Sequence, residues 1–86
     1  MQLSVELTFS PLRDDFDEPI ANFIKRLRAS EFTVLENPLS TQVYGEYDPL
    51  MSFLTQEIKE AFGAIDHGLV YMKLVNSNRS DYQPDF

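Results

Sequence analysis

The segment 2–10 constrains the fold more than any other part of the chain, because its side chains alternate strictly between apolar and polar. Successive side chains of a β-strand point to opposite faces of its sheet. The segment is therefore predicted to be a strand with one face buried under helices and one open, polar face. The buried face comprises Leu3, Val5, Leu7 and Phe9, and the open face comprises Gln2, Ser4, Glu6, Thr8 and Ser10.

A helix is predicted next, over about residues 18–29, because apolar side chains recur there with helical spacing after Pro11. Asp17 or Glu18 is expected to cap its N-terminus. The basic side chains near its other end suit the negative pole of the helix dipole. The apolar stripe consists of Phe16, Ile20, Phe23, Ile24 and Leu27.

A hairpin and a second helix follow in the pattern. Segments 32–37 and 40–47 are rich in strand-forming residues and are separated by a short turn, which predicts two paired strands. Asp48 and Pro49 are expected to start a helix as its cap and first residue, and Gly63 is expected to end it. Its predicted buried stripe consists of Leu50, Met51, Leu54, Ile58, Ala61 and Phe62.

Segment 69–75 is nearly continuous in apolar residues and is predicted to be the last strand. The order β-α-β-β-α-β is that of a ferredoxin-like α+β sandwich, in which a four-stranded antiparallel sheet carries two helices on one face. Right-handed crossovers then place the first and third strands at the centre of the sheet. Residues 1–76 are expected to form this single domain, and residues 77–86 a polar C-terminal tail.

Composition narrows the possible partners. A net charge of −7 repels nucleic acid and anionic membranes, and no apolar stretch is long enough to span a bilayer. The N-terminus lacks the features of a signal peptide, so a cytoplasmic protein without membrane insertion is expected. A chain of 86 residues often gains stability by association, so a homodimer or higher homo-oligomer is expected.

The sequence gives little support for catalysis. It contains no cysteine, one histidine and no Gly-x-Ser-x-Gly elbow. His67 is interpreted as a residue of a surface turn, and a lone histidine makes a poor metal site. We therefore predict a protein that is not an enzyme and that has neither catalytic residues nor a metal ion.

Two polar segments are candidates for binding. Asp14 and Asp15 precede the first helix, where they either complement its dipole or contact a ligand. Segment 40–46 is unusually polar for a central strand, which indicates either a ligand or contact with solvent or another subunit. Gly45 in this segment marks either a close approach or a bulge.

The chain resembles the YkoF-like family in two stretches, Phe9-Ser10-Pro11-Leu12-Arg13-Asp14-Asp15-Phe16 and Leu39-Ser40-Thr41-Gln42-Val43-Tyr44-Gly45-Glu46. The resemblance spans about residues 1–76. It implies a ferredoxin-like domain that binds thiamine or its hydroxymethylpyrimidine part as a ligand rather than a cofactor, in vitamin uptake, salvage or sensing. The polar contacts that it implies are Ser10, Asp14, Asp15, Ser40 and Thr41.

Two other functions fit the same fold. One is an oligomeric interaction or regulatory module that uses the open sheet face and binds no small ligand. The other is an acylphosphatase-like hydrolase, which needs a phosphate-binding loop with arginine. Asp14 and Asp15 occupy the corresponding turn here and would repel that substrate.

Overall fold

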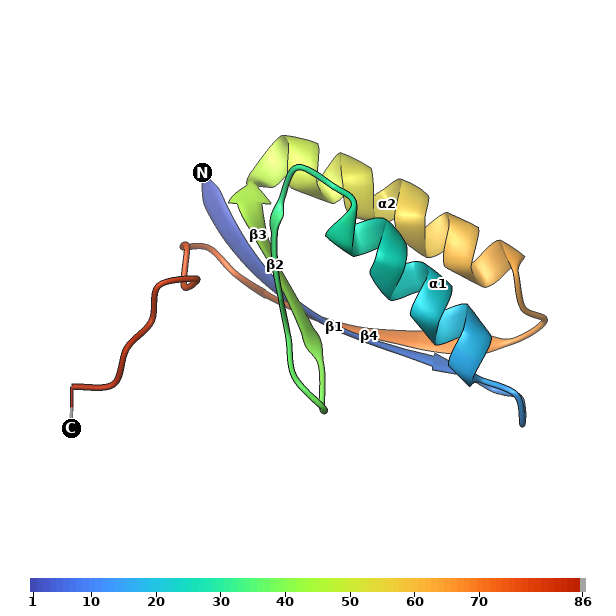
Figure 1. The fold of residues 1–86 in the computed structure, drawn as a ribbon. Helices are drawn as coiled ribbons and strands as arrows, with labels where there is room; N and C mark the ends of the chain where they lie inside the picture. The colour runs from blue at the N-terminus through green and yellow to red at the C-terminus, as the bar shows by residue number, and fades with distance from the viewer. Residues whose placement is uncertain (86) are drawn as a thin grey trace.

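The computed structural model describes residues 1–85, which form one four-stranded sheet and two helices. The strand order is β2-β3-β1-β4, and each neighbouring pair is antiparallel. Both helices lie on the same face of the sheet (Figure 1). This confirms the predicted ferredoxin-like fold, with the first and third strands at the centre. The elements are β1 (Gln2–Pro11), α1 (Asp17–Arg28), β2 (Thr33–Glu36), β3 (Thr41–Glu46), α2 (Tyr47–Gly63) and β4 (Gly68–Val75).

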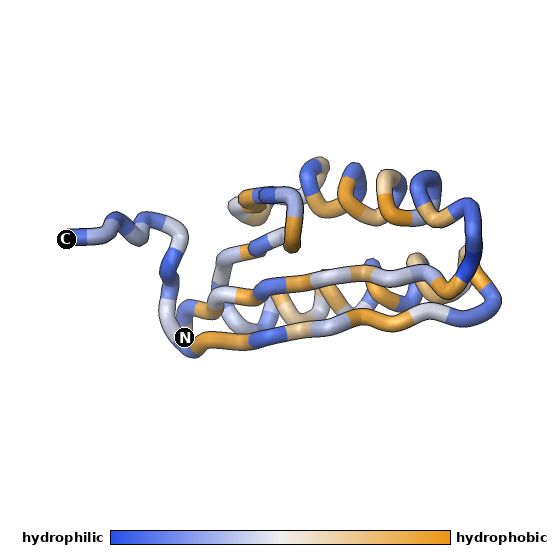
Figure 2. The backbone as a smooth tube through the Cα atoms, turned by 90° about the horizontal axis from the view of Figure 1, so that it is seen from below, coloured by the Kyte–Doolittle hydropathy of each residue, from blue (hydrophilic) through white to orange (hydrophobic). Residues whose placement is uncertain are grey.

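Strand β1 supplies one side of the hydrophobic core, as its alternation predicted. Leu3, Val5, Leu7 and Phe9 are buried beneath the helices. The helices contribute Phe23, Leu27, Leu50, Leu54 and Ala61 to the same core. Seen from below, hydrophobic and hydrophilic residues alternate along the strands, whereas the C-terminal tail is mostly hydrophilic (Figure 2).

The pairing register decides which side chains of β3 face the helices. Leu7 lies opposite Thr41 and Val5 opposite Val43, and directly opposed residues point to the same side of a sheet. Thr41, Val43 and Gly45 therefore face the helix layer. A Cβ atom added at Gly45 would lie 2.6 Å from Cδ1 of Phe32, so this glycine makes room for a core ring.

Helix α1 begins one residue earlier than expected, and its predicted cap is wrong. Phe16 is the N-cap, and no side chain caps the helix. Asp17 and Glu18 lie in the first turn, where their charge still favours the positive end of the dipole. Phe16 lies before the helix and is 48% exposed, so it does not belong to the core stripe.

Helix α2 also begins early, at Tyr47, with Glu46 rather than Asp48 at the N-cap position. The backbone N–H of Tyr47 donates to the carbonyl of Met1 at 2.9 Å. This bond satisfies one of the free N–H groups of the helix end without a side-chain cap. Gly63 ends the helix as predicted, although Phe62 beside it is 42% exposed.

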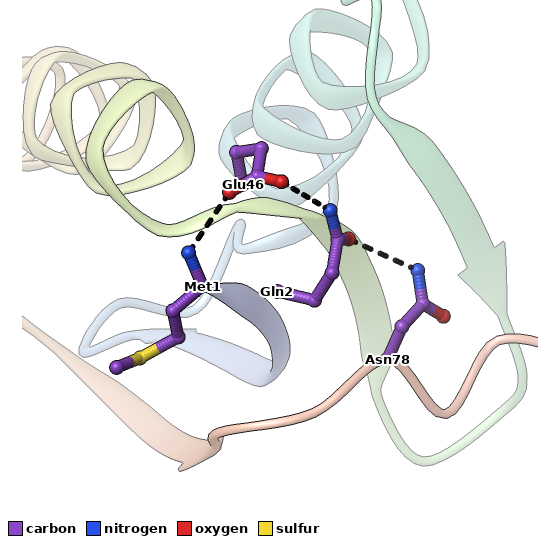
Figure 3. A network of polar contacts seen from close by, with 4 residues as sticks. All are labelled: Met1, Gln2, Glu46 and Asn78. Carbon is purple, nitrogen blue, oxygen red and sulfur yellow. Dashed lines mark hydrogen bonds and ion pairs between the residues drawn. The ribbon is translucent and has the colours of Figure 1, made fainter.

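Polar contacts join the start of β1 to the end of β3 and to the residues after β4 (Figure 3). The carboxylate of Glu46 accepts bonds from the Met1 ammonium at 3.1 Å and from Nε2 of Gln2 at 2.6 Å. The bond with this ammonium is the largest cause of a lowered pKa for Glu46. Nδ2 of Asn78 donates to Oε1 of Gln2 at 3.3 Å.

The tail also returns to Ser4, which is buried although it lies on the open face of the sheet. The Ser4 hydroxyl donates to the carbonyl of Ser77 at 2.6 Å and accepts the N–H of Arg79 at 2.9 Å. The first residues of the tail are therefore held against β1.

We expect Ser4→Ala to release these residues from the sheet. The substitution removes one donor and one acceptor from a buried site, which costs about 1–3 kcal/mol of the free energy of unfolding. Hydrogen exchange at the Arg79 amide should accelerate, whereas Ser52→Ala on the exposed surface of α2 should leave it unchanged. Unchanged exchange at Arg79 in Ser4→Ala would show that Ser4 does not hold the tail.

Candidate functional site

A cavity of about 190 Å³ lies between helix α1, the second half of β1 and the turn that joins β2 to β3. The hairpin of β2 and β3 diverges from the pair β1 and β4 at this end of the sheet (Figure 1). The residues that line the cavity are Leu7, Thr8, Phe9, Ile20, Phe23, Ile24, Glu36, Asn37, Pro38, Leu39, Ser40 and Thr41.

The turn at one side of the cavity is fixed by Asn37. Its side-chain oxygen Oδ1 accepts the backbone N–H of Leu39 at 2.8 Å and that of Ser40 at 3.0 Å. The backbone N–H of Asn37 donates to the carbonyl of Ser40 at 3.1 Å. An asparagine that bonds backbone groups in this way stabilises a tight turn, and Pro38 further restricts it. The wall formed by this turn is therefore well defined.

Thr41 provides the buried polar group of the cavity. It is 6% exposed and faces the helix layer beside Leu7. Its hydroxyl makes no hydrogen bond with any of residues 1–85. Among the side-chain atoms of residues 1–85, only Nη2 of Arg26 is fully buried without a partner, so the Thr41 oxygen is open to the cavity. A hydroxyl is both a donor and an acceptor. Thr41 is therefore available to bond a polar atom that enters the cavity.

The deeper walls are apolar and aromatic. The rings of Phe9 and Phe23 meet edge to face, with centroids 5.3 Å apart. Ile20 and Ile24 of α1 are half-buried beside them, and Leu39 at the turn is 85% exposed. A flat ring that enters the cavity would thus contact aromatic and aliphatic side chains.

Glu36 is the one charged residue in the lining, and its charge is already balanced. Nε of Arg28 lies 2.5 Å from one of its carboxylate oxygens, and Nη2 lies 2.7 Å from the other. The hydrogen bonds from Arg28 are the main cause of a lowered pKa for Glu36. This fork-shaped pair also joins the end of α1 to β2, which fixes the hairpin relative to the helix.

The structure places two of the five candidate residues at the cavity, namely Ser40 and Thr41. Neighbouring residues of a strand point to opposite faces, so their hydroxyls have different surroundings. The Ser40 hydroxyl donates to Oε2 of Glu6 at 3.1 Å and accepts Nε2 of Gln42 at 2.8 Å. Ser40 thus belongs to a polar network on the open face of the sheet.

Ser10, Asp14 and Asp15 lie outside the lining of this cavity. Ser10 pairs with Leu69 near the end of β1. Asp14 and Asp15 are exposed in the loop before α1. Asp15 accepts two bonds of 2.6 Å from Arg13, which lower the pKa of its carboxyl group. The five residues therefore do not form one cluster.

Sequence reasoning missed Asn37 and the α1 residues Ile20 and Ile24 as parts of the site. Their helical spacing predicts that the isoleucines belong to the core stripe of the helix, but they are only half-buried because the hairpin diverges from them. Asn37-Pro38 is a recognisable turn signal that could have indicated where the hairpin reverses.

No group of three or more histidine, aspartate or glutamate side chains lies close enough together along residues 1–85 to hold a metal ion. Neither helix of this part of the chain has the length and apolar character needed to cross a membrane.

Similar folds occur in solved structures. A Streptococcus pneumoniae protein is 28% identical, with a TM-score of 0.83 over 91% of this chain and 89% of its own. A Thermotoga maritima protein, named as a candidate thiamine biosynthesis/salvage protein, is 15% identical with a TM-score of 0.81, over 90% and 85% of the two chains. A domain of unknown function, DUF77, from Bacillus cereus is 16% identical with a TM-score of 0.74, over 99% and 79%. No family profile and no curated protein matches the sequence.

The lowered pKa of Glu36 predicts a pH-dependent contribution to stability. The Arg28–Glu36 pair should stabilise the protein fully above the ordinary glutamate pKa of 4.5, and this contribution should be lost as the pH falls through the lower, folded value. The difference in melting temperature between the parent and Glu36→Gln should therefore shrink between about pH 7 and about pH 3. A difference that is constant across this range would contradict the assignment.

Proposed function

We propose that the cavity binds the pyrimidine part of thiamine, as free hydroxymethylpyrimidine or as one ring of the vitamin, without catalysing a reaction. The observation that carries this proposal is the Thr41 hydroxyl, which has no partner among residues 1–85 and lines a small cavity with aromatic walls. An aminopyrimidine presents donors and acceptors at the edge of a flat ring, so it can bond the hydroxyl while its faces contact Phe9 and Phe23.

The size of the cavity favours one ring over two. An apolar cavity of roughly 150 Å³ in a protein is enough to hold benzene. The cavity of about 190 Å³ therefore accommodates a six-membered ring with short substituents. The second ring of thiamine would lie outside it, in contact with solvent.

The charges around the cavity also favour a neutral pyrimidine ring inside it and a cationic ring outside it. Glu36, the one charged residue in the lining, is paired with Arg28, so the interior suits a neutral ring. The exposed side chains of Asp14, Asp17 and Glu18 lie before and at the start of α1, close along the chain to Ile20. Their field attracts a cation to this end of the molecule. The positively charged thiazolium ring of thiamine is suited to this outer position.

The fold neighbours and the family resemblance support this ligand class. The resemblance to YkoF-like proteins rests on stretches 9–16 and 39–46, and the second of these contains the turn and Thr41. One solved neighbour carries a name linked to thiamine biosynthesis or salvage. A role in uptake, salvage or sensing of the vitamin is consistent with a binding domain of this kind.

The lining also supports binding without catalysis. The cavity contains hydroxyl groups, but a nucleophilic hydroxyl needs a neighbouring base. Glu36 is held by Arg28, and His67 is exposed and outside the lining. No activated nucleophile is therefore formed by the residues that surround the cavity.

Calorimetric titration of the purified protein with hydroxymethylpyrimidine and, separately, with thiamine tests the proposal. Saturable binding at roughly micromolar concentration is expected for a ligand of this size, and the cavity provides one site per chain. Both ligands should displace each other, since they share the pyrimidine. A folded sample that gives no heat with either ligand would sink the proposal.

Thr41→Val should weaken binding roughly tenfold, because the new side chain has nearly the same volume and lacks the hydroxyl. The stability of the free protein should change little, since this hydroxyl has no partner within residues 1–85 to lose. Thr33→Val, at an exposed position on β2, is the matched control. Equal affinity of Thr41→Val and the parent would remove Thr41 from the site.

The open sheet face favours a second function, that of an interaction module. Leu35, Leu69 and Tyr71 are exposed on this face, with exposed fractions of 43%, 44% and 62%. Such apolar side chains suit contact with another protein. This function becomes the better account if neither ligand binds and the protein is nonetheless associated with a partner.

A further inference from the structure

The outer edge of β4 is a long strand edge without a partner among residues 1–85. Gly68–Val75 forms the last strand in the sheet order and pairs with β1 on one side only. After β4, Ser77 and Arg79 bond the Ser4 side chain of β1, so this part of the chain leaves the outer side of β4 uncovered. The backbone N–H and C=O groups on that side are free to pair with another strand.

The two edges of the sheet differ in their protection. Natural sheets block edge pairing with short strands, charges and prolines. The other edge strand, β2, has only four residues and ends in Glu36, and Asn37-Pro38 follow it. Strand β4 has eight residues, no proline, no acidic side chain and a single charge at Lys73. One edge is therefore blocked and the other is open.

The helices also leave β4 incompletely covered. On the helix side, Val70 and Met72 are only half-buried and Leu74 is 43% exposed. On the open side, Tyr71 is 62% exposed. Apolar side chains on both faces of an edge strand would be covered by a further strand placed beside it.

We propose that two copies of this chain pair their β4 strands antiparallel about a two-fold axis and form one continuous eight-stranded sheet. A second copy is the occupant that the charges favour. The chain carries a net charge of −7, so most of its surface repels another copy, whereas the edge formed by β4 has no acidic residue. An isologous contact of this kind closes on itself and gives a dimer.

The alternation of side chains restricts the register. Opposed residues must point to the same side of the sheet, so a pair of identical strands can shift only in steps of two residues. One register places Met72 at the axis, Val70 opposite the partner's Leu74 and Tyr71 opposite the partner's Lys73. Apolar residues then meet on the helix side, and each ammonium lies beside an aromatic ring on the open side.

The neighbouring registers are less favourable. A shift of one step places Lys73 opposite the partner's Lys73, and like charges directly opposite each other are destabilising. A shift in the other direction places Lys73 opposite the partner's Leu69, so the ammonium faces neither an opposite charge nor an aromatic ring on the other strand. We therefore assign the axis to Met72.

This dimer is independent of the ligand proposal. No residue of β4 lines the cavity, so both copies would keep a complete cavity facing solvent. A dimer that binds neither hydroxymethylpyrimidine nor thiamine would contradict the proposed function and leave the dimer inference intact. Full ligand binding by a monomer would contradict the dimer alone.

Light scattering coupled to size exclusion should give twice the chain mass of 10.0 kDa. The chain has no cysteine, so Met72→Cys introduces a single thiol at the axis, and mild oxidation should join two chains. Antiparallel partners have Cα atoms ~4.5–5.5 Å apart, within the range of a disulfide. Thr33→Cys on the blocked edge is the control and should remain largely uncrosslinked.

Substitutions at Tyr71 test the register without disturbing the core, because this side chain is largely exposed. Tyr71→Lys places two ammonium groups opposite each other twice per dimer and should raise the dimer dissociation constant roughly tenfold. Tyr71→Glu forms two opposite-charge pairs in the same register and should keep the dimer.

A monomer at all concentrations would overturn the inference. A dimer that tolerates Tyr71→Lys and is crosslinked by Gln42→Cys on the open face, but not by Met72→Cys, would also overturn it in favour of face-to-face packing.

Discussion

The structure depends on the burial of one face of β1 beneath both helices. Leu3, Val5, Leu7 and Phe9 lie in the core, and the strand is paired with β3 on one side and with β4 on the other. Because side chains alternate, burial of this face sets the register of both neighbours. It places Thr41 opposite Leu7 on the helix side, and it brings the ring of Phe9 against those of Phe23 and Phe62.

The two sides of β1 provide two different surfaces. On the β3 side, the Asn37 turn and the Arg28–Glu36 pair fix the position of the hairpin relative to α1, and a small cavity with Thr41 in its wall lies between them. On the β4 side, the sheet extends beyond the helices and ends in an open edge. The proposed ligand binding and the proposed association therefore involve different sides of β1, so one can change without the other.

Periodicity in the sequence was sufficient for the fold, because β1 and both helices bury regularly spaced side chains. It failed at the helix starts, since the N–H of Tyr47 is satisfied by the distant carbonyl of Met1 rather than by a local cap. Polarity in a central strand indicated Thr41 and Ser40, but not that the pleat directs their hydroxyls to opposite faces. The cavity itself was not predictable, because it depends on how far the hairpin diverges from α1.

The most direct measurement is a map of backbone amide chemical shifts during titration with hydroxymethylpyrimidine. We expect saturable shifts confined to the residues that line the cavity, namely those in the second half of β1, in the turn from Glu36 to Thr41, and at Ile20, Phe23 and Ile24 of α1. The amides of β4, on the other edge of the sheet, should stay unchanged. Saturable shifts centred on the open sheet face, with none at the turn, would contradict the account.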